Sequence, residues 1–235
     1  MERLDKILSS TARWSRREVK ELIREGRVTV NGLPAVSPED KTDREADIRV
    51  DGETVSCAQY TYLMLHKPAG LVSATQDPRE PTVLSLLPEH MRNIGLFPAG
   101  RLDKDTVGLL LLTNDGALAH DLLAPKKHVD KIYLVRVEGV FDDADIAAFR
   151  EGLTLADGYT CLPADLELLG PSEALATLHE GKYHQIKRMC AARGKPVVFL
   201  KRLTFGPLKL DESLEPGEWR ELTAEEVEDL RNSSK

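Results

Sequence analysis

The stretch of sequence that decides the fold runs from Ala99 to Gly116 and reads AGRLDKDTVGLLLLTNDG. A polar, charge-dense turn is followed there by an apolar run that contains the four leucines 109–112. A short apolar run of this kind, closed by the turn residues Asn-Asp-Gly, is typical of a buried strand rather than of a surface helix. The sequence therefore predicts a charged loop that is carried by a rigid strand of the core.

Asp103 is the candidate reactive group of this loop. A carboxylate held beside an apolar core, with Arg101 and Lys104 one or two positions away, can stay ionised and become reactive. The alternative is ordinary turn and cap chemistry, because short polar side chains often satisfy backbone donors at loop ends. The residues alone leave both interpretations open.

The segment GRLDKDTVGLLLLTNDG resembles the signature of the pseudouridine synthases, in the branch of the ribosomal small-subunit enzyme, the RsuA family. In that family the Asp of the GRLD element is catalytic, so the resemblance gives this role to Asp103. The implied reaction isomerises a uridine within RNA to pseudouridine, with the carboxylate attacking the sugar or the base or removing a ribose proton. We expect the target base to be flipped into a pocket, and Arg101 to fill the vacated space or hold the RNA backbone.

Length and composition limit the classes of protein that the chain can be. A chain of 235 residues with 41% hydrophobic content can form one ordinary core and a small satellite domain. Because no stretch approaches the roughly 18 apolar residues of a membrane span and no signal peptide is recognisable, we expect a cytoplasmic protein with no membrane partner. Cys57, Cys161 and Cys190 lack CxxC spacing, which argues against a disulfide framework and a thiolate zinc site.

The net charge of -7 conceals a strong pattern along the chain. Residues 178–209 contain eight Lys or Arg and one acid, Glu180, whereas residues 211–231 contain nine acids and two Arg. One surface can therefore be basic while the whole protein is acidic. Such a surface is compatible with phosphate binding, to which counterion release contributes affinity independently of sequence.

The first residues predict a compact helix and hairpin. Ser15 and Glu18 form a capping box, with Trp14 and Val19 as a hydrophobic staple, so a helix should begin at Arg16 and run to about residue 25 before Gly26. An alternating strand, residues 27–30, then runs into the hairpin signal Asn-Gly. The cations of the helix form a stripe, which is either a solvated face with internal ion pairs or a phosphate-binding face.

The sequences RLDKIL and SRREVKELIREGRVTVNG in this module are similar to the alpha-L RNA-binding motif of a small-subunit ribosomal protein and of many RNA-modifying enzymes. This resemblance favours the phosphate-binding interpretation. It implies that the following side chains contact RNA: Arg3, Lys6, Arg16, Arg17, Lys20 and Arg24.

Two further segments resemble landmarks of the RsuA-type catalytic domain. The HKPAG element, residues 66–70, is a turn that follows an alternating run over residues 60–65. Residues 77–82 form a stiff loop that leads to a short helix over residues 83–87. The domains expected are an RNA-binding domain over 1–55, a linker over 56–61 and a catalytic domain over 62–235.

A predicted strand over residues 131–137 carries Tyr133 on the same face as Lys131 and Val135. A Tyr on a strand usually packs in a core. The family resemblance instead gives the Tyr of K-x-Y-x-V a place stacked on, or hydrogen bonded near, the reactive base. Similarly, residues 197–206 predict a buried strand that turns outward, and Leu203 of RLTFG matches a residue that lines the uracil pocket of the family. Core packing is the alternative for Leu203.

The run GKYHQIKRM, residues 181–189, predicts a strand end that breaks at Gly181 into a helix stopping at Gly194. In the related enzymes this run supplies a basic residue that pairs with the catalytic carboxylate, and alignment on HQI places Lys187 there, where some branches have Arg. Lys is a point charge and fixes the pair less rigidly than Arg. Arg188 lies about 100° away on the helix, so we expect it, with Lys182, to contact RNA. His179 and His184 lack a third ligand at a recognisable spacing, so no metal is expected.

We therefore expect an α+β protein: a small N-terminal alpha-L RNA-binding domain and a larger pseudouridine synthase domain with a mixed, mainly antiparallel sheet whose middle is crossed by the active cleft. The isomerisation involves no net oxidation or hydrolysis, so no cofactor is expected, in agreement with the missing Walker and dinucleotide motifs. The expected partner is small-subunit ribosomal RNA or an assembling ribonucleoprotein particle, bound by a monomer. The alternatives are a large-subunit enzyme of the same family, a noncatalytic RNA-binding or ribosome-assembly protein, and a glycosidic hydrolase that releases uracil.

Overall fold

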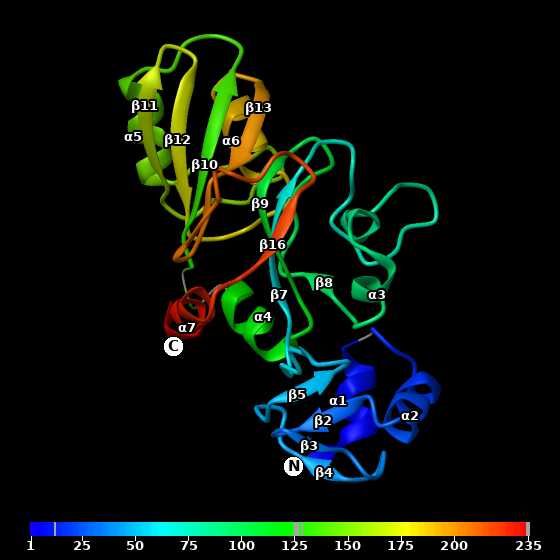
Figure 1. Ribbon diagram of the computed structural model, residues 1–235. Coiled ribbons are helices and arrows are strands. Elements are labelled where there is room, and N and C mark those ends of the chain that lie inside the picture. Colours follow the sequence, from blue (N-terminus) through cyan, green and yellow to red (C-terminus); the bar gives the residue numbers. More distant parts are fainter. Residues whose placement is uncertain (12, 125–126, 128, 234–235) are drawn as a thin grey trace. The chain divides into compact units, whose positions relative to one another are not determined.

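The computed structural model describes residues 1–11, 13–124, 127 and 129–233. The chain forms two compact units. The first unit comprises Met1–Thr61 and Leu87–Leu96, and the second comprises Tyr62–Leu86 and Phe97–Lys235. Both contain helices and strands (Figure 1), which confirms the predicted α+β class. No helix among the described residues is long and apolar enough to cross a bilayer.

The first unit packs the first two of its helices and a small antiparallel sheet around one apolar core. The four-stranded sheet has the order β3-β2-β5-β6, and β1 pairs separately with β4. The elements are β1 (Glu2–Arg3), α1 (Leu4–Ser10), α2 (Arg16–Arg24), β2 (Val28–Val30), β3 (Leu33–Pro34), β4 (Lys41–Thr42), β5 (Ile48–Val50), β6 (Glu53–Thr54) and α3 (Glu89–Arg92). The core extends to Val55 and Cys57.

The local signals of this unit correctly predicted its structure. The Ser15 hydroxyl accepts a hydrogen bond from the Glu18 amide at 3.3 Å, and the Ser15 amide donates to the Glu18 carboxylate at 2.6 Å. The helix α2 ends at Arg24, one residue before the predicted end. Asn31 and Gly32 have φ values of 51° and 80°, the left-handed pair that a two-residue hairpin turn requires.

The second unit is built on an eight-stranded sheet with the order β11-β12-β10-β13-β9-β7-β16, in which β8 also pairs with β9. Its strands are β7 (Tyr62–Lys67), β8 (Phe97–Pro98), β9 (Val107–Thr113), β10 (Lys131–Val137), β11 (Asp165–Gly170), β12 (Glu173–Leu178), β13 (Val197–Arg202) and β16 (Trp219–Glu221). The pairing of β13 with β9 is parallel and the other strand pairs are antiparallel. The predicted mixed, mainly antiparallel sheet is confirmed.

The apolar run of residues 107–113 forms β9, in the middle of this sheet. Leu109–Leu112 are fully buried in β9, between β7 and β13. Two predictions about the neighbouring strands were wrong. All six residues of β7 are buried, not alternating, and β13 is not uniformly buried, since Val198 is 59% exposed. Periodicity failed there because burial of a strand depends on what covers each of its faces.

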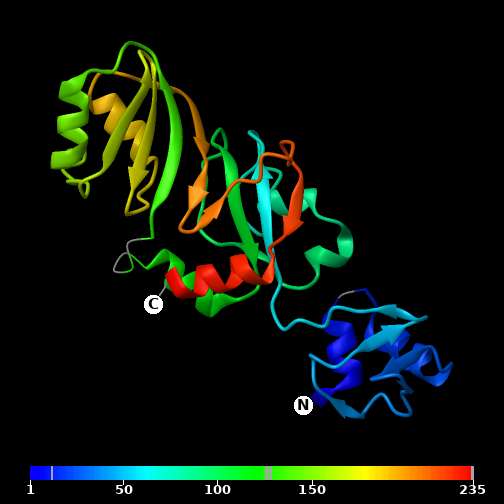
Figure 2. The ribbon, with the colours of Figure 1, turned by 60° about the vertical axis from the view of Figure 1, so that its left-hand side comes forward.

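Helices and a hairpin complete the second unit. The remaining elements are η1 (Val83–Leu86), α4 (Gly116–Leu123), α5 (Asp143–Glu151), α6 (Gln185–Ala192), β14 (Thr204–Phe205), β15 (Leu208–Lys209) and α7 (Ala224–Ser233). Helices α4 and α7 lie side by side in both ribbon views (Figures 1 and 2). The Tyr62 hydroxyl of β7 joins them, because it donates to Asp115, the N-cap of α4, at 2.7 Å and accepts from Arg231 of α7 at 3.2 Å.

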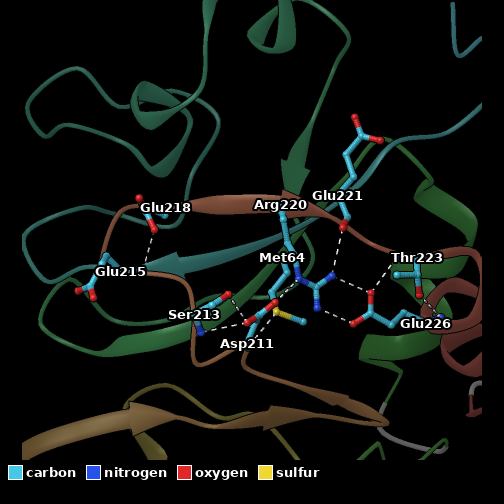
Figure 3. A network of polar contacts seen from close by, with 9 residues as sticks. All are labelled: Met64, Asp211, Ser213, Glu215, Glu218, Arg220, Glu221, Thr223 and Glu226. Atoms are coloured by element: carbon cyan, nitrogen blue, oxygen red, sulfur yellow. Dashed lines mark hydrogen bonds and ion pairs between the residues drawn. The ribbon is translucent and has the colours of Figure 1, made fainter. Parts of the chain in front are cut away.

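Arg220 of β16 fastens the acidic C-terminal segment to the sheet (Figure 3). Its guanidinium donates to Asp211 at 2.6 Å and to both carboxylate oxygens of Glu226 at 2.7 and 2.8 Å. Hydrogen bonds from Ser213 and Arg220 lower the pKa of Asp211 to about 2. Part of the negative charge of this segment is therefore neutralised within the fold.

Candidate active site

The loop that carries Asp103 is held by the segment that follows β7. The Ser73 hydroxyl donates to the Leu102 carbonyl at 2.8 Å and accepts from the Leu102 amide at 3.0 Å. The Gly70 amide donates to the Lys104 carbonyl at 2.7 Å. Ser73 therefore fixes the backbone before Asp103, and the HKPAG element fixes the backbone after it.

Lys67 is the central residue of this attachment, and the sequence analysis assigned it no role. Its side chain is fully buried at the end of β7, and its ammonium donates to the carbonyls of Pro68 and Thr106, both at 2.9 Å, and more weakly to that of Lys104 at 3.3 Å. Burial lowers the pKa of Lys67 to about 8, against the attraction of Asp105 and Asp103. The signal that could have revealed it is a lysine at the end of an apolar strand, directly before a Pro-Gly turn.

Asp103 and Lys187 are in contact, as the sequence predicted. The Lys187 ammonium lies 2.9 Å from Asp103 Oδ2 and 2.5 Å from Asp105 Oδ1, and both Asp103 and Lys187 are largely buried. Burial alone would lower the pKa of Lys187, but its hydrogen bonds to Asp105 and Asp103 raise it. The same hydrogen bond from Lys187 lowers the pKa of Asp105.

The cations adjacent to Asp103 in sequence do not pair with it, contrary to prediction. Lys104 binds Glu80 at 2.7 Å, and Arg101 is exposed. Neighbouring side chains in a turn point in different directions, so the partner of Asp103 comes from α6, more than eighty residues along the chain.

His184 approaches the second oxygen of the same carboxylate. Its Nε2 lies 3.4 Å from Asp103 Oδ1, and its backbone is left-handed, with φ 50° and ψ 35°, at the N-cap of α6. A left-handed conformation is uncommon for a residue with a side chain and costs free energy. From the sequence, His184 is a candidate only for metal binding, and no group of three metal-ligating side chains is found in the described part of the chain.

Glu180 anchors the start of α6, which carries Lys187. Its buried carboxylate accepts hydrogen bonds from the Tyr159 hydroxyl at 2.6 Å, the Gln185 amide group at 2.7 Å and the Leu162 backbone amide at 2.9 Å. Three donors on one buried carboxylate fix the loop before α6. The position of Lys187 opposite Asp103 therefore depends on a second polar network.

Tyr133 lies on the row of residues that crosses the sheet to the start of β9. It pairs with Arg202 of β13, which pairs with Gly108 of β9, so Tyr133 is two strand spacings, about 10 Å, from Gly108. Tyr133 is buried. Leu203 is partly exposed, and its amide donates to the Ile132 carbonyl at 2.8 Å.

The candidate RNA-binding cations divide into paired and unpaired groups. Arg188 binds Asp157 at 2.5 Å, and the Lys182 ammonium lies 4.8 Å from the centre of the Tyr159 ring. In the first unit, ion pairs join Arg3 to Asp5, Lys6 to Glu2 and Arg17 to Glu21. Within the described ranges, the candidate cations without an ion-pair partner within 4 Å are Arg16, Lys20 and Arg24 in the first unit and Lys182 in the second.

Comparisons with known proteins agree with this arrangement. A family model described as RNA pseudouridylate synthase matches residues 61–192, and the S4 domain model matches residues 2–48. An uncharacterized RNA pseudouridine synthase of Bacillus subtilis is 47% identical over 96% of both chains. Ribosomal small subunit pseudouridine synthase A of Pseudomonas aeruginosa is 41% identical over 96% of this chain and 98% of its own length.

A solved structure of a pseudouridylate synthase is also similar to this chain. It is described as a crystal structure of pseudouridylate synthase, has 38% sequence identity and a TM-score of 0.70, and the match covers 98% of this chain and all of that one. The N-terminal module that the sequence predicted to bind RNA is the region matched by the S4 domain. The chain belongs to the RNA pseudouridine synthase family and is an isomerase of the RsuA type with an N-terminal S4 domain.

Proposed function

We propose that this enzyme converts one uridine of small-subunit ribosomal RNA to pseudouridine, with Asp103 as the catalytic carboxylate. The substrate is supported by relatives that are named ribosomal small subunit pseudouridine synthase A, among them that of Escherichia coli, which is 41% identical over 96% of this chain. A ribosomal RNA substrate would also place the enzyme in the cytoplasm. The residue assignment is supported by the contact between Asp103 and Lys187 on a loop that Lys67 and Ser73 hold in place.

The reaction needs one ionised carboxylate and no exchange of electrons with a cofactor. The bond from N1 of uracil to C1′ of ribose breaks, a bond from C5 to C1′ forms, C5 loses its proton and N1 gains one. Lys187 stabilises the negative charge through Asp103 Oδ2. Oδ1 is left for the substrate, since its distance of 3.4 Å to His184 exceeds that of a good hydrogen bond.

The target base must leave its stack before it can reach this carboxylate, at a cost of a few kcal/mol. We assign Tyr133 to stack on or hydrogen bond near the flipped base, and Leu203 to the apolar wall of its pocket. Arg101, which is exposed, is assigned to the vacated space or the RNA backbone. Contacts to phosphates offset the cost, and we assign them to Arg3, Lys6, Arg16, Arg17, Lys20, Arg24, Lys182 and Arg188.

The test is to incubate the purified protein separately with unmodified transcripts of small- and large-subunit ribosomal RNA and to map pseudouridine in each. We expect one new pseudouridine, in the small-subunit transcript. Modification of the large-subunit transcript alone would contradict the proposed substrate. Binding without modification would indicate a noncatalytic protein, and release of free uracil would indicate a hydrolase.

A further inference from the structure

Tyr183 presents an open aromatic face next to the active site. Its side chain is on the loop before α6 and is 75% exposed, whereas Tyr133 is buried. The ring stacks on that of His184, with 3.8 Å between the ring centroids and 17° between the ring planes. One face of the Tyr183 ring is therefore covered by His184, and the stack leaves the opposite face open to a ligand.

The stack connects this open face to the catalytic carboxylate. His184, which covers the inner face of Tyr183, has its Nε2 3.4 Å from Asp103 Oδ1. A planar group on the outer face of Tyr183 would thus be one aromatic layer from the ring that touches Asp103. No residue of this stack is used by the function proposed above.

The loop geometry holds the stack in place before RNA binds. His184 has a left-handed backbone, and the Lys182 amide before it donates to Gln185 Oε1 at 3.0 Å. Gln185 in turn donates to the buried Glu180 at 2.7 Å. Strained backbone that the surrounding contacts maintain is typical of functional loops. An aromatic side chain that is already ordered loses little conformational entropy on binding.

The charge around Tyr183 favours a nucleic acid as the ligand. Lys182, which has no ion-pair partner in the described ranges, precedes it. Lys187 and Arg188 follow on the first turns of α6, where Lys187 pairs with Asp103 and Asp105 and Arg188 pairs with Asp157. Exposed aromatic rings among cations are the chemistry with which proteins bind unpaired nucleotides, because bases stack on the ring while the cations attract phosphates.

We propose that the open face of Tyr183 stacks on a base of the RNA that neighbours the target uridine. This inference rests on the function proposed above, because flipping a uridine toward Asp103 leaves its neighbours without a stacking partner. Tyr183 replaces that lost partner. It is thus a substrate-binding residue whose contribution comes from its ring and does not depend on the hydroxyl group.

The test is to measure the dissociation constant of the full-length enzyme for a small-subunit ribosomal RNA transcript at several salt concentrations. Tyr183→Ala should weaken binding roughly 5- to 150-fold, the loss expected for one base–aromatic stack. Tyr183→Phe should bind within about twofold of the wild type because it keeps the ring. The control is Leu169→Ala, which truncates another exposed side chain, on the edge strand β11, and it should have no effect.

Salt dependence separates stacking from charge. Tyr183→Ala should keep the wild-type slope of log K against log salt, because it removes no phosphate contact, whereas Lys182→Ala, which removes a cation without an ion-pair partner in the described ranges, should flatten that slope. The inference is overturned if Tyr183→Ala binds like the wild type, as it would if the ring served a protein partner, or if Phe and Ala weaken binding equally.

This binding measurement is independent of turnover, so it distinguishes failure of this inference from failure of the proposed function. If no pseudouridine forms in the transcript, the proposed function fails, while the affinities of the Phe and Ala variants still decide whether the ring stacks on RNA. A wild-type protein that does not bind the transcript overturns both.

Discussion

At the scale of single residues, one ammonium group forms ion pairs with two carboxylates. Lys187 contacts Asp103 and Asp105, and its hydrogen bond lowers the pKa of Asp105. Asp105 is 74% exposed, so water screens its charge, whereas Asp103 is 24% exposed and depends more on the ammonium. Lys187 therefore holds the pKa of Asp105 below its usual range while it also pairs with Asp103.

The titration of Asp105 should reveal this interaction. In Lys187→Met the Asp105 carboxylate loses the hydrogen bond that lowers its pKa, so the pKa of Asp105 should rise. The sign follows because an opposite charge favours the ionised form, and its removal lets a proton bind at higher pH. Lys187→Arg keeps the positive charge and should leave the pKa of Asp105 low. Titration of the carboxyl groups by NMR measures both variants, and a pKa of Asp105 that is the same in Lys187→Met as in the wild type would contradict the interaction.

The contact between Asp103 and Lys187 was expected, whereas the contacts of Lys67 and His184 were not. The first expectation came from the resemblance of the two motifs to those of a known family. Lys67 acts through backbone carbonyls that any residue supplies, so no partner residue type marks it. His184 reaches Asp103 because of a left-handed backbone, which no feature of its sequence neighbourhood specified.

At the scale of elements, the parallel contact between β9 and β13 requires glycine at position 108. Gly108 has φ +104°, and a Cβ placed on it would lie 2.2 Å from the Arg202 carbonyl oxygen. The backbone of β13 therefore approaches β9 more closely than any side chain allows. This contact positions the start of β9, directly after the loop that carries Asp103.

Gly108→Ala should lower the free energy of unfolding by about 1–3 kcal/mol or more, since both overpacking and a strained φ oppose it. It should also reduce turnover by moving the loop. The matched control is Gly116→Ala, at the first residue of α4, where the added Cβ would meet open space. Chemical denaturation measures both variants, and equal stabilities would refute the packing argument.

Element prediction succeeded where the signal was local and failed where it depended on neighbours. The capping box before α2, the hairpin turn at residues 31–32 and the alternation along β10 are encoded within a few residues, and all three are present. The burial of β7 and the exposure of Val198 on β13 depend on which elements cover each face, and sequence periodicity carries no information about that.

At the scale of the whole molecule, a protein of net charge -7 must offer RNA a local basic surface. The structure shows how the charges are separated. Arg220 binds Asp211 and Glu226 within the second unit. In the first unit, Arg16, Lys20 and Arg24 recur every four residues along α2, beside its buried apolar residues, with no ion-pair partner within 4 Å in the described ranges.

The triple variant Arg16→Ala, Lys20→Ala, Arg24→Ala should therefore weaken RNA binding at low salt and reduce the slope of log K against log salt by roughly 2 to 3. Arg27→Ala is the control, because Arg27 is already paired with Asp51 and Glu25 and lies outside α2. Filter binding at a series of salt concentrations measures both. An unchanged slope in the triple variant would remove this face from the RNA contact.

The two-part organisation could be predicted because composition and motif change along the chain. Its details could not, since Leu87–Leu96 groups with the first unit although it lies between elements of the second. Contacts between distant segments set such groupings. The domain boundaries 1–55 and 62–235 stay a proposal.

The central claim is that Asp103 performs the isomerisation, and release of tritium from RNA labelled at C5 of uridine tests it most directly. Each turnover expels the C5 hydrogen, so Asp103→Asn should lower release by at least about a thousandfold while the affinity for RNA stays near that of the wild type. Asp105→Asn, which alters the other carboxylate on Lys187, should retain release. Substantial tritium release by Asp103→Asn would contradict the account.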